Sequence, residues 1–365
     1  MLLAATSLVA ALAVAELGLR AVGPSPPAEG LRSLHEPRPD RPWLYGLRPG
    51  AVGRLEISGD VLYRINADGF RDRRYAIPKP PGTFRIVVLG DSIAFGYGVE
   101  ERDAFPKVLE SRLSELAPAA HVEVVNLGVS GYNAYTEAEL LKDVGVKYQP
   151  DLVLLQFCIN DLNDPTVHFD AQTRLHLGSI PDAAYPDPTR RAPPPRMPSI
   201  ASGCRRRLAL CALLDDALLA WTTPEPDAAA RRAAVAPVVA DGPEWRWLER
   251  LYQEMARETG RVGARFVVLA FPYASQMHGR RSQPVENRLV AMGERDGWVT
   301  VDLLPAFQDL AARSHERLFF DWWHPKATGH ALAAEQILDA LACRGLLPPG
   351  VGVACPHELS AAGGK

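Results

Sequence analysis

Three polar residues that are far apart in the sequence could together cleave an ester bond. Ser92 follows a Gly-Asp pair at the end of the apolar run 85–89, and Asp321 and His324 stand three residues apart near the other end of the chain. A serine hydroxyl is a weak nucleophile until a base removes its proton, and an imidazole, which titrates near neutral pH, suits that task. The carboxylate could accept the second imidazole N–H and stabilise the imidazolium. These residues predict nucleophilic acyl transfer, provided that the fold brings them together.

Other residues could stabilise the oxyanion that forms when an ester is attacked. The backbone N–H groups of Ser92 and Gly131 and the side-chain amide of Asn160 would supply three donors. Glycine at position 131 lets the backbone approach the substrate closely. Asp91 and Asp161, the chain neighbours of Ser92 and Asn160, are expected to support these two turns. The alternative for Asp91 and Ser92 is that they only cap the following helix.

Five short runs rich in branched apolar residues are expected to form strands that are buried on both faces of a parallel sheet. They span residues 85–89, 122–126, 152–157, 265–271 and 298–303. Segments with helical spacing are found at residues 105–116, 136–145 (beginning with a capping box, Thr136–Glu139), 245–260, 283–292 and 331–343. Strands that alternate with helices predict an α/β fold, namely a doubly wound, flavodoxin-like, five-stranded parallel sheet with helices on both faces. Ligands bind beyond the carboxyl ends of such strands, where Ser92 and Asn160 are expected.

The remaining segments indicate how the chain is divided. Before the main domain we expect a membrane anchor or signal segment at residues 1–22, a Pro-rich linker at 23–42, and a small β module at 43–82 with a hairpin of residues 54–57 and 61–66. The main domain is expected at residues 83–346, with a helical and Pro-rich insertion at 162–241, and a tail follows at 347–365. The insertion could form a lid over the strand ends, and helical packing near the membrane is the alternative.

The beginning of the chain is strongly apolar. Residues 1–19 contain a single charge, Glu16, before Arg20 ends the run. About twenty apolar residues cross a bilayer as a helix, so we expect an uncleaved anchor that holds the protein at a membrane. The alternative is a secretion signal that is cleaved after the small residues at 13–15. Both interpretations predict that the catalytic domain is extracytoplasmic, in the periplasm or at the cell surface, or secreted after cleavage.

The chain has five cysteines. Cys158 lies inside an apolar run, which is typical of a small buried residue, and no electropositive neighbour would make it a nucleophile. The other four permit three pairings. In an oxidising compartment the simplest hypothesis is two local disulfides, and free thiols are the alternative. The two bonds would join Cys204 with Cys211 and Cys343 with Cys355.

The polar blocks occur in the order that characterises a known superfamily. The SGNH (GDSL-type) esterase and acyltransferase superfamily has four blocks, which resemble Gly90-Asp91-Ser92, Gly131, Asn160-Asp161 and Asp321-x-x-His324 of this chain. The resemblance covers residues 85–343 apart from the insertion, and it implies the fold and a Ser-His-Asp mechanism. Residues 66–71 and 95–99 resemble envelope-anchored bacterial members. Cys158 departs from the pattern, because the third block usually begins with Gly, and the extra side chain could narrow the pocket.

Composition and charge exclude several classes of function. The formal net charge is -3, and the dense basic cluster Arg205–Arg207 contains no aromatic residue, so no nucleic-acid partner is expected. The nine histidines lack the spacing of a zinc site, and residues 160–164 lack the glycine and the distal Glu that calcium loops use. We therefore expect neither a metal nor another cofactor.

Three functions are compatible with these observations. The first is a membrane-tethered serine esterase that removes acyl groups from a small-molecule or carbohydrate substrate, with O-acetyl esters of envelope or extracellular polysaccharide as the expected case. The second is a polysaccharide O-acetyltransferase, in which a sugar hydroxyl intercepts the acyl-serine before water does. The third is a non-catalytic glycan-binding or assembly factor on the same scaffold, and the intact Ser92, Asp321 and His324 argue against it. Ester hydrolysis is the function that we predict.

Overall fold

The computed structural model describes residues 34–38, 40–56, 60–162, 243–277, 284–314, 317–321, 323–348, 350–352 and 355. All of them belong to one of the two units into which the chain divides, the unit of residues 31–185 and 238–365. The predicted anchor and nearly all of the predicted insertion lie outside the described residues. No helix among the described residues is both long enough and apolar enough to span a bilayer.

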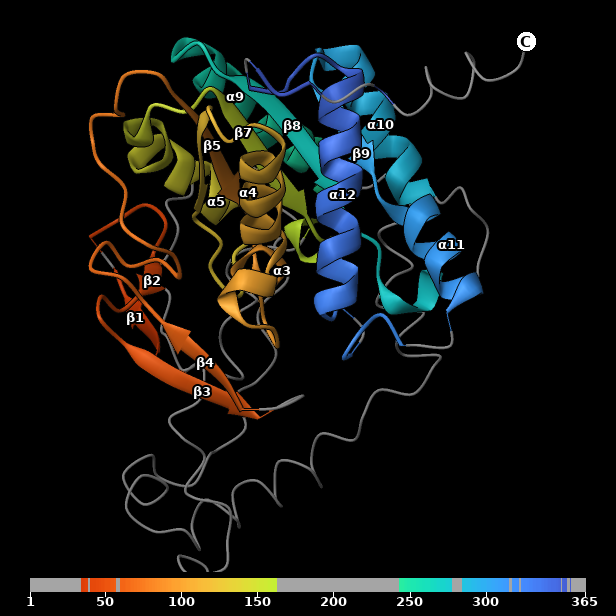
Figure 1. Ribbon diagram of the computed structural model, residues 1–365, viewed down its shortest axis with the longest axis horizontal. Helices are drawn as coiled ribbons and strands as arrows, with labels where there is room; N and C mark the ends of the chain where they lie inside the picture. Colours follow the sequence, from red (N-terminus) through yellow and green to blue (C-terminus); the bar gives the residue numbers. More distant parts are fainter. Residues whose placement is uncertain are drawn as a thin grey trace, which may run out of the picture. The chain divides into compact units, whose positions relative to one another are not determined.

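A five-stranded parallel sheet occupies the centre of the structure (Figure 1). Its strands are β5 (Thr83–Leu89), β6 (His121–Asn126), β7 (Leu152–Phe157), β8 (Arg265–Ala270) and β9 (Val299–Asp302). All neighbouring pairs are parallel, and the order is β6-β5-β7-β8-β9, which confirms the predicted doubly wound, flavodoxin-like sheet. The chain turns outward in opposite directions from β5, so the carboxyl ends of β5 and β7 flank the crevice where such folds bind ligands.

Helices cover both faces of the sheet, so its central strands are apolar on both sides. Along β5, Ile86 and Val88 belong to one buried cluster and Val87 and Leu89 to the other. The first cluster lies under α4 (Phe105–Leu116), α11 (Leu304–Arg313) and α12 (Ala327–Cys343), and the second under α5 (Ala134–Asp143), α9 (Pro243–Arg261) and α10 (Pro284–Asp296). Figure 1 shows α4 and α12 side by side in front of the sheet. Burying one such side chain contributes roughly 1.5–3 kcal/mol, so these clusters hold the sheet firmly beneath its carboxyl edge.

Two helices differ from the sequence-based expectation. The side chain of Asn133 caps α5 and accepts a hydrogen bond from the N–H of Thr136, whose hydroxyl completes the capping box, so the box predicted at Thr136–Glu139 is wrong. The sequence analysis does not predict α11. This helix begins two residues after β9 and carries Pro305 in its first turn, where a helix tolerates proline.

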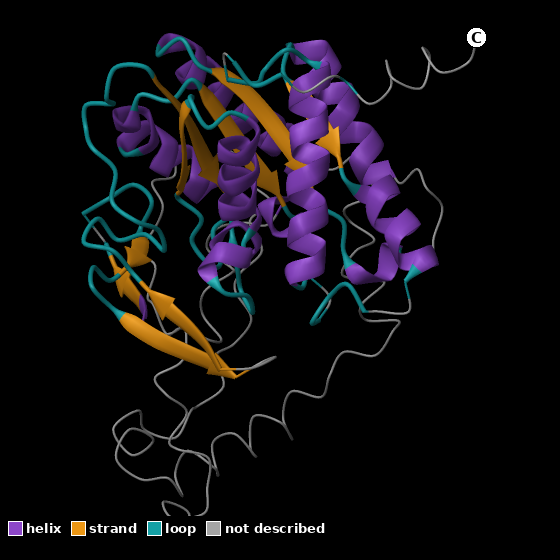
Figure 2. Ribbon diagram, in the orientation of Figure 1, coloured by secondary structure: helices purple, strands orange, loops and turns teal. Residues whose placement is uncertain are grey.

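Two antiparallel strand pairs precede the large sheet (Figure 2). β1 (His35–Pro37) pairs with β2 (Tyr45–Leu47), and β3 (Val52–Glu56) pairs with β4 (Asp60–Arg64), which confirms the predicted hairpin. β1 lies in the segment that was expected to be a linker. The sequence does not predict this strand, because three residues that include a proline are too few to show an alternation of apolar and polar residues. Tyr45 and Tyr63 are buried in the same cluster as Val87, so these strands pack on the main domain. We call the described residues between 34 and 82 the N-terminal module.

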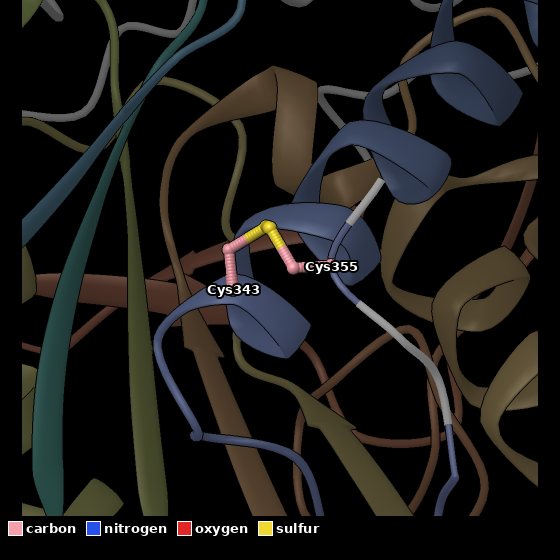
Figure 3. The surroundings of a disulfide bond; sticks show 2 residues. All are labelled: Cys343 and Cys355. Carbon is pink, nitrogen blue, oxygen red and sulfur yellow. A yellow bond between two sulfur atoms is a disulfide. The ribbon is translucent and has the colours of Figure 1, made fainter. Parts of the chain in front are cut away.

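A disulfide joins Cys343, the last residue of α12, to Cys355 (Figure 3). This confirms one of the two expected bonds, whereas Cys204 and Cys211 lie outside the described residues. Cys158 is a free, buried cysteine, as expected. The bond ties the segment after α12 to the end of that helix and so limits the freedom of the unfolded chain.

A substitution at Gly128 can test how tightly α3 (Ser92–Phe95) is packed against the end of β6. A Cβ at this position would lie 2.6 Å from the backbone nitrogen of Phe95, so Gly128→Ala is expected to lower the free energy of unfolding by about 1–3 kcal/mol. A Cβ added to Gly260, in α9, would meet no neighbouring atom within 4 Å, and Gly260→Ala should leave stability unchanged or raise it by at most about 1 kcal/mol. Urea unfolding of both variants measures the difference; equal midpoints would contradict the close packing.

Candidate active site

Ser92 begins the short helix α3, immediately beyond the carboxyl end of β5. Asp91 caps this helix by accepting a hydrogen bond from a backbone N–H of its first turn, at 2.8 Å. Gly90 is required just before it, because a Cβ there would lie 2.5 Å from Oε1 of Gln156 on β7. That oxygen accepts hydrogen bonds from two backbone N–H groups of the same turn. The nucleophile turn is therefore fixed by the neighbouring strand.

Asp321 and His324 lie on a tight loop between Phe319 and Pro325, which form an isolated β-bridge. We call residues 319–325 the acid–base loop. Oδ1 of Asp321 accepts hydrogen bonds from the backbone N–H groups at positions 323 and 324, at 2.8 and 2.9 Å. Oδ2 of Asp321 lies 2.7 Å from Nδ1 of His324. One carboxylate therefore both folds the loop and orients the imidazole.

The ionisation of Asp321 suits this arrangement. Partial burial raises the pKa of Asp321, but the hydrogen bond and charge of His324 and two backbone N–H donors outweigh burial, and the pKa lies below its usual value. A carboxylate that stays charged at neutral pH holds the proton on Nδ1 and stabilises an imidazolium when Nε2 becomes protonated.

One hydrogen bond connects the nucleophile turn to the acid–base loop. Nε2 of His324 lies 2.8 Å from Oγ of Ser92, although 232 residues separate them in the sequence. This is the distance at which an imidazole can take the hydroxyl proton during nucleophilic attack. The structure therefore brings Ser92, His324 and Asp321 together in the order that an acyl-transfer site requires.

The expected oxyanion donors come from the loops after β5, β6 and β7. In the described part of the chain, neither the N–H of Ser92 nor that of Gly131 donates a hydrogen bond within the protein. Gly131 has a φ of +87°, a left-handed conformation that favours glycine. Asn160 donates one amide N–H to the carbonyl oxygen of Tyr132 at 2.8 Å, which ties it to the glycine loop, and its side chain also forms a hydrogen bond with the carboxyl group of Asp91. The geometry thus leaves the backbone N–H groups of Ser92 and Gly131 for a substrate oxygen, whereas the amide of Asn160 is engaged by Tyr132 and Asp91.

Three carboxyl groups are buried next to these loops, at Asp91, Glu137 and Asp161. Asp91 precedes the nucleophile, Asp161 follows the oxyanion asparagine, and Glu137 comes from α5. One oxygen of Asp161 accepts hydrogen bonds from the Cys158 N–H and the Tyr252 hydroxyl. Its other oxygen and both oxygens of Glu137 have no hydrogen-bond partner among the described residues.

Burial controls the charge of this carboxyl cluster. It raises the pKa of Glu137 well above its usual value, and the negative charges of Asp161 and Asp91 raise it further. Burial and the charge of Asp91 likewise raise the pKa of Asp161 well above the usual range. A carboxyl group without a donor keeps its proton in an apolar surrounding, because the charged form loses its hydration. Burial and the neighbouring carboxyl groups thus both favour the neutral form of Glu137, which would spare the oxyanion a third negative charge.

Asp91 and Asp161, which the sequence analysis expects to support the two turns, lie next to Ser92 and Asn160, and the sequence analysis misses two other buried polar side chains at these loops. It assigns Glu137 to a capping box, and it passes over Gln156, which holds the nucleophile turn. Two signals could have revealed them. One is a glutamate on the buried side of a helix, and the other is a lone glutamine within the apolar run 152–157, because a buried polar group needs a partner.

The thiol of Cys158 is poorly suited to act as a nucleophile in place of Ser92. Burial, followed by the charges of Asp91 and Asp161, raises the pKa of the Cys158 thiol well above its usual value, so the reactive thiolate is disfavoured. Across the described ranges, no group of three or more His, Cys, Asp or Glu side chains is arranged to hold a metal ion.

A cavity of about 440 Å³ opens at the opposite edge of the sheet. Arg265 and Val299, the first residues of β8 and β9, line it together with Arg257 of α9. None of the residues of the candidate site borders this cavity, so it does not receive the acyl group that Ser92 would attack.

Comparison with known proteins gives one family and several distant structures. The profile of the GDSL-like lipase/acylhydrolase family matches residues 88–332. No curated protein matches the chain. TesA is 14% identical with a TM-score of 0.42 over 70% of this chain and 97% of TesA. A catalytic mutant of Axe2, an acetylxylan esterase from Geobacillus stearothermophilus, is 13% identical with a TM-score of 0.43 over 71% of this chain and 94% of Axe2.

A third solved structure is similarly distant. LAE5, an α/β hydrolase enzyme from the metagenome of Lake Arreo in Spain, is 18% identical with a TM-score of 0.42 over 75% of this chain and 98% of LAE5. At these identities and TM-scores, the substrates in the names of these proteins are not transferred to this chain.

The neutral state of Glu137 predicts how stability depends on pH. The unfolded chain ionises Glu137 above its usual pKa of 4.5, whereas the folded protein keeps the proton. The wild type should therefore lose stability relative to Glu137→Gln as pH rises from about 4 towards the folded pKa, by up to about 1.4 kcal/mol per pH unit. Urea unfolding at pH 4, 6 and 8 measures this trend. The control is Glu115→Gln, whose side chain is 57% exposed. A pH-independent difference for Glu137→Gln would show that the folded protein ionises this group.

Proposed function

Because the chain belongs to the GDSL-like lipase/acylhydrolase family and is a serine hydrolase that acts on ester bonds, we propose that it cleaves acyl esters through Ser92, His324 and Asp321. The observation that carries this proposal is the pair of short contacts around the imidazole. Nε2 of His324 lies 2.8 Å from Oγ of Ser92, and Nδ1 lies 2.7 Å from Oδ2 of Asp321. A nucleophile, a base and a group that orients the base are thus in contact before substrate binds.

The proposed reaction has two half-reactions. In the first, Oγ of Ser92 attacks the carbonyl carbon while Nε2 of His324 takes the hydroxyl proton. When the tetrahedral intermediate collapses, the bond to the alcohol oxygen breaks, the imidazolium protonates the leaving alkoxide, and the acyl group remains on Ser92. In the second, water attacks the acyl-serine with the same base, and the carboxylic acid leaves.

The oxyanion of each tetrahedral intermediate is proposed to lie against the N–H groups of Ser92 and Gly131 and the side-chain amide of Asn160, which would exchange its hydrogen bond to Asp91 for one to the oxyanion. Donors that are already in place cost little reorganisation when the charge develops, and the loss of one such donor typically costs about 3–4 kcal/mol. The neutral Glu137 behind the loops supports this assignment, since an added negative charge there would oppose the oxyanion.

We propose O-acetyl and other short acyl esters of envelope or extracellular polysaccharide as the substrate. The support is compartmental: residues 1–19 are apolar enough for a membrane anchor, and the bond between Cys343 and Cys355 is of the kind that persists outside the cytoplasm. In this proposal the catalytic domain is held at the membrane through residues 1–19 and faces the periplasm or the cell surface, or it is secreted if the segment is cleaved.

The hydrolase proposal predicts a graded series of activities. The full-length protein in detergent should hydrolyse p-nitrophenyl acetate, and Ser92→Ala should lower kcat/KM at least about a thousandfold. Asn160→Ala should lower it about 100- to 1,000-fold, because one oxyanion donor is lost. Arg74→Met, which removes an exposed side chain on the N-terminal module, is the control. Equal activity of the wild type and Ser92→Ala would overturn the proposal, and acetyl transfer to an added sugar in place of acetate release would identify an O-acetyltransferase.

The proposed location has a separate test. Alkaline phosphatase fused after residue 365 should be active in a bacterial host, because this reporter needs an oxidising compartment, and the fusion should sediment with membranes. Deletion of residues 1–22 should abolish the reporter activity. An inactive fusion of the full chain would contradict export.

A further inference from the structure

The segment of residues 95–99, which begins at the last residue of α3, packs against the acid–base loop at two points. The ring of Tyr97 lies on the imidazole of His324, with 4.1 Å between the ring centroids and 34° between the planes. One residue later, Gly98 lies so close to Phe320 that a Cβ would be 2.6 Å from its ring. The segment therefore contacts the base and the residue next to the acid.

Arg71 of the N-terminal module holds this segment by its carbonyl groups. Its two terminal nitrogens donate hydrogen bonds of 3.1, 2.7 and 2.8 Å to the carbonyl oxygens of Phe95, Gly96 and Val99. The side chain is only 1% exposed, and burial lowers the pKa of Arg71. Burying a guanidinium costs free energy, so apolar packing alone does not explain its presence. Its planar guanidinium presents five N–H donors in a fixed geometry, so two of its nitrogens bind carbonyl groups along the same segment at once.

Tyr63 of β4 holds the same segment from the N–H side. Its hydroxyl accepts a hydrogen bond from the N–H of Gly98 at 2.7 Å. Its ring stacks on Phe95 at 5.3 Å, and the guanidinium carbon of Arg71 lies 4.0 Å from the centre of the Tyr63 ring. The backbone that carries Tyr97 is thus fixed on both sides by one module.

We propose that Tyr97 is a positioning residue for the imidazole of His324, and that Arg71 and Tyr63 of the N-terminal module set its place. This inference rests on the proposed role of His324 as the catalytic base. The ring of Tyr97 keeps the imidazole in line with Ser92 and, because an aromatic face attracts a cation, it stabilises the imidazolium that forms during each half-reaction.

The other titratable groups that face His324 should not contribute to a change in the pH profile when Tyr97 is substituted. Burial lowers the pKa of His330, on α12, to about 3, so it stays neutral, and burial raises the pKa of Tyr97 itself to about 12. Asp321 stays charged, because its pKa lies below the usual value. Asp91, at the cap of α3, also faces the imidazole and is common to all variants compared. A change in the pH profile on substitution of Tyr97 therefore reports the contact between the two rings.

The test is the pH dependence of kcat/KM for p-nitrophenyl acetate with the full-length protein. Tyr97→Leu removes the ring, so the imidazolium loses its partner and the base stays deprotonated at lower pH. The acid limb should move to lower pH by about 0.4 to 1.5 units, and the plateau should fall about 10- to 100-fold. Tyr97→Phe retains the ring and should keep the acid limb in place. An unmoved acid limb in Tyr97→Leu would overturn the inference.

The role of the module is tested by a double-mutant cycle. Arg71→Met should move the acid limb in the same direction as Tyr97→Leu, and the double variant should be no more impaired than the worse single one, because both changes disrupt one unit. If the losses in kcat/KM of the two single variants add in the double variant, and the acid limb of Arg71→Met does not move, Arg71 stabilises the fold without positioning Tyr97. Tyr63→Phe, which removes only the acceptor of the Gly98 N–H, provides the same readout if Arg71→Met does not fold. Arg74→Met is the control on the same module.

The outcome for this inference is separable from that for the proposed function. If the wild type and Ser92→Ala do not differ in activity, the catalytic assignment itself fails. If they differ as expected and Tyr97→Leu keeps the wild-type acid limb, only the role of Tyr97 fails.

Discussion

The proposed chemistry depends on one hydrogen bond, between Oγ of Ser92 and Nε2 of His324. No local structure can set this distance, because the serine follows β5 and the histidine precedes α12 at the far end of the chain. The distance is set by packing: α12 lies against α4 and the sheet, and the sheet is apolar on both faces. A buried parallel sheet does not slide or bend easily, so it can hold two side chains to within about 0.5 Å.

The same packing explains why polar groups can be buried beneath the site. Gln156, Asn160 and the carboxyl cluster replace apolar contacts that would have stabilised the fold more, and several of their atoms have no donor or acceptor among the described residues. What they provide is electrostatic. A carboxyl that is buried without donors stays neutral, so Glu137 fills space beside the oxyanion loops without repelling the charge that develops there. Burial of these residues thus lowers the stability of the fold, and it also favours the neutral carboxyl groups that are compatible with catalysis.

Features that depend on residues close together in the sequence could be predicted, whereas contacts between residues far apart in the sequence could not. The strands were predictable because burial on both faces leaves a local apolar run, and Ser92, Asp321 and His324 because their chemistry is distinctive. Tyr97 was not, since nothing in the neighbouring sequence shows that a tyrosine lies on an imidazole. Glu137 and Gln156 were overlooked, although the buried helix side and the apolar run that contain them are signals of a buried polar group. β1 was missed because its pairing with β2, rather than its own composition, makes it a strand.

The two halves of the site differ in how they are supported. The nucleophile turn is bonded directly to β7 through Gln156, whereas the acid–base loop keeps its shape mainly through Asp321 and one β-bridge. Asp321 is 44% exposed, so water can compete for the hydrogen bonds that fold the loop. The acid–base loop therefore needs a second contact that water does not compete for. The packing of the Tyr97 ring on the imidazole of His324 supplies it. Because the hydrogen bonds of Arg71 within the described ranges go to the backbone around Tyr97 and not to a carboxylate, the N-terminal module is better understood as part of the site's framework than as an appendage.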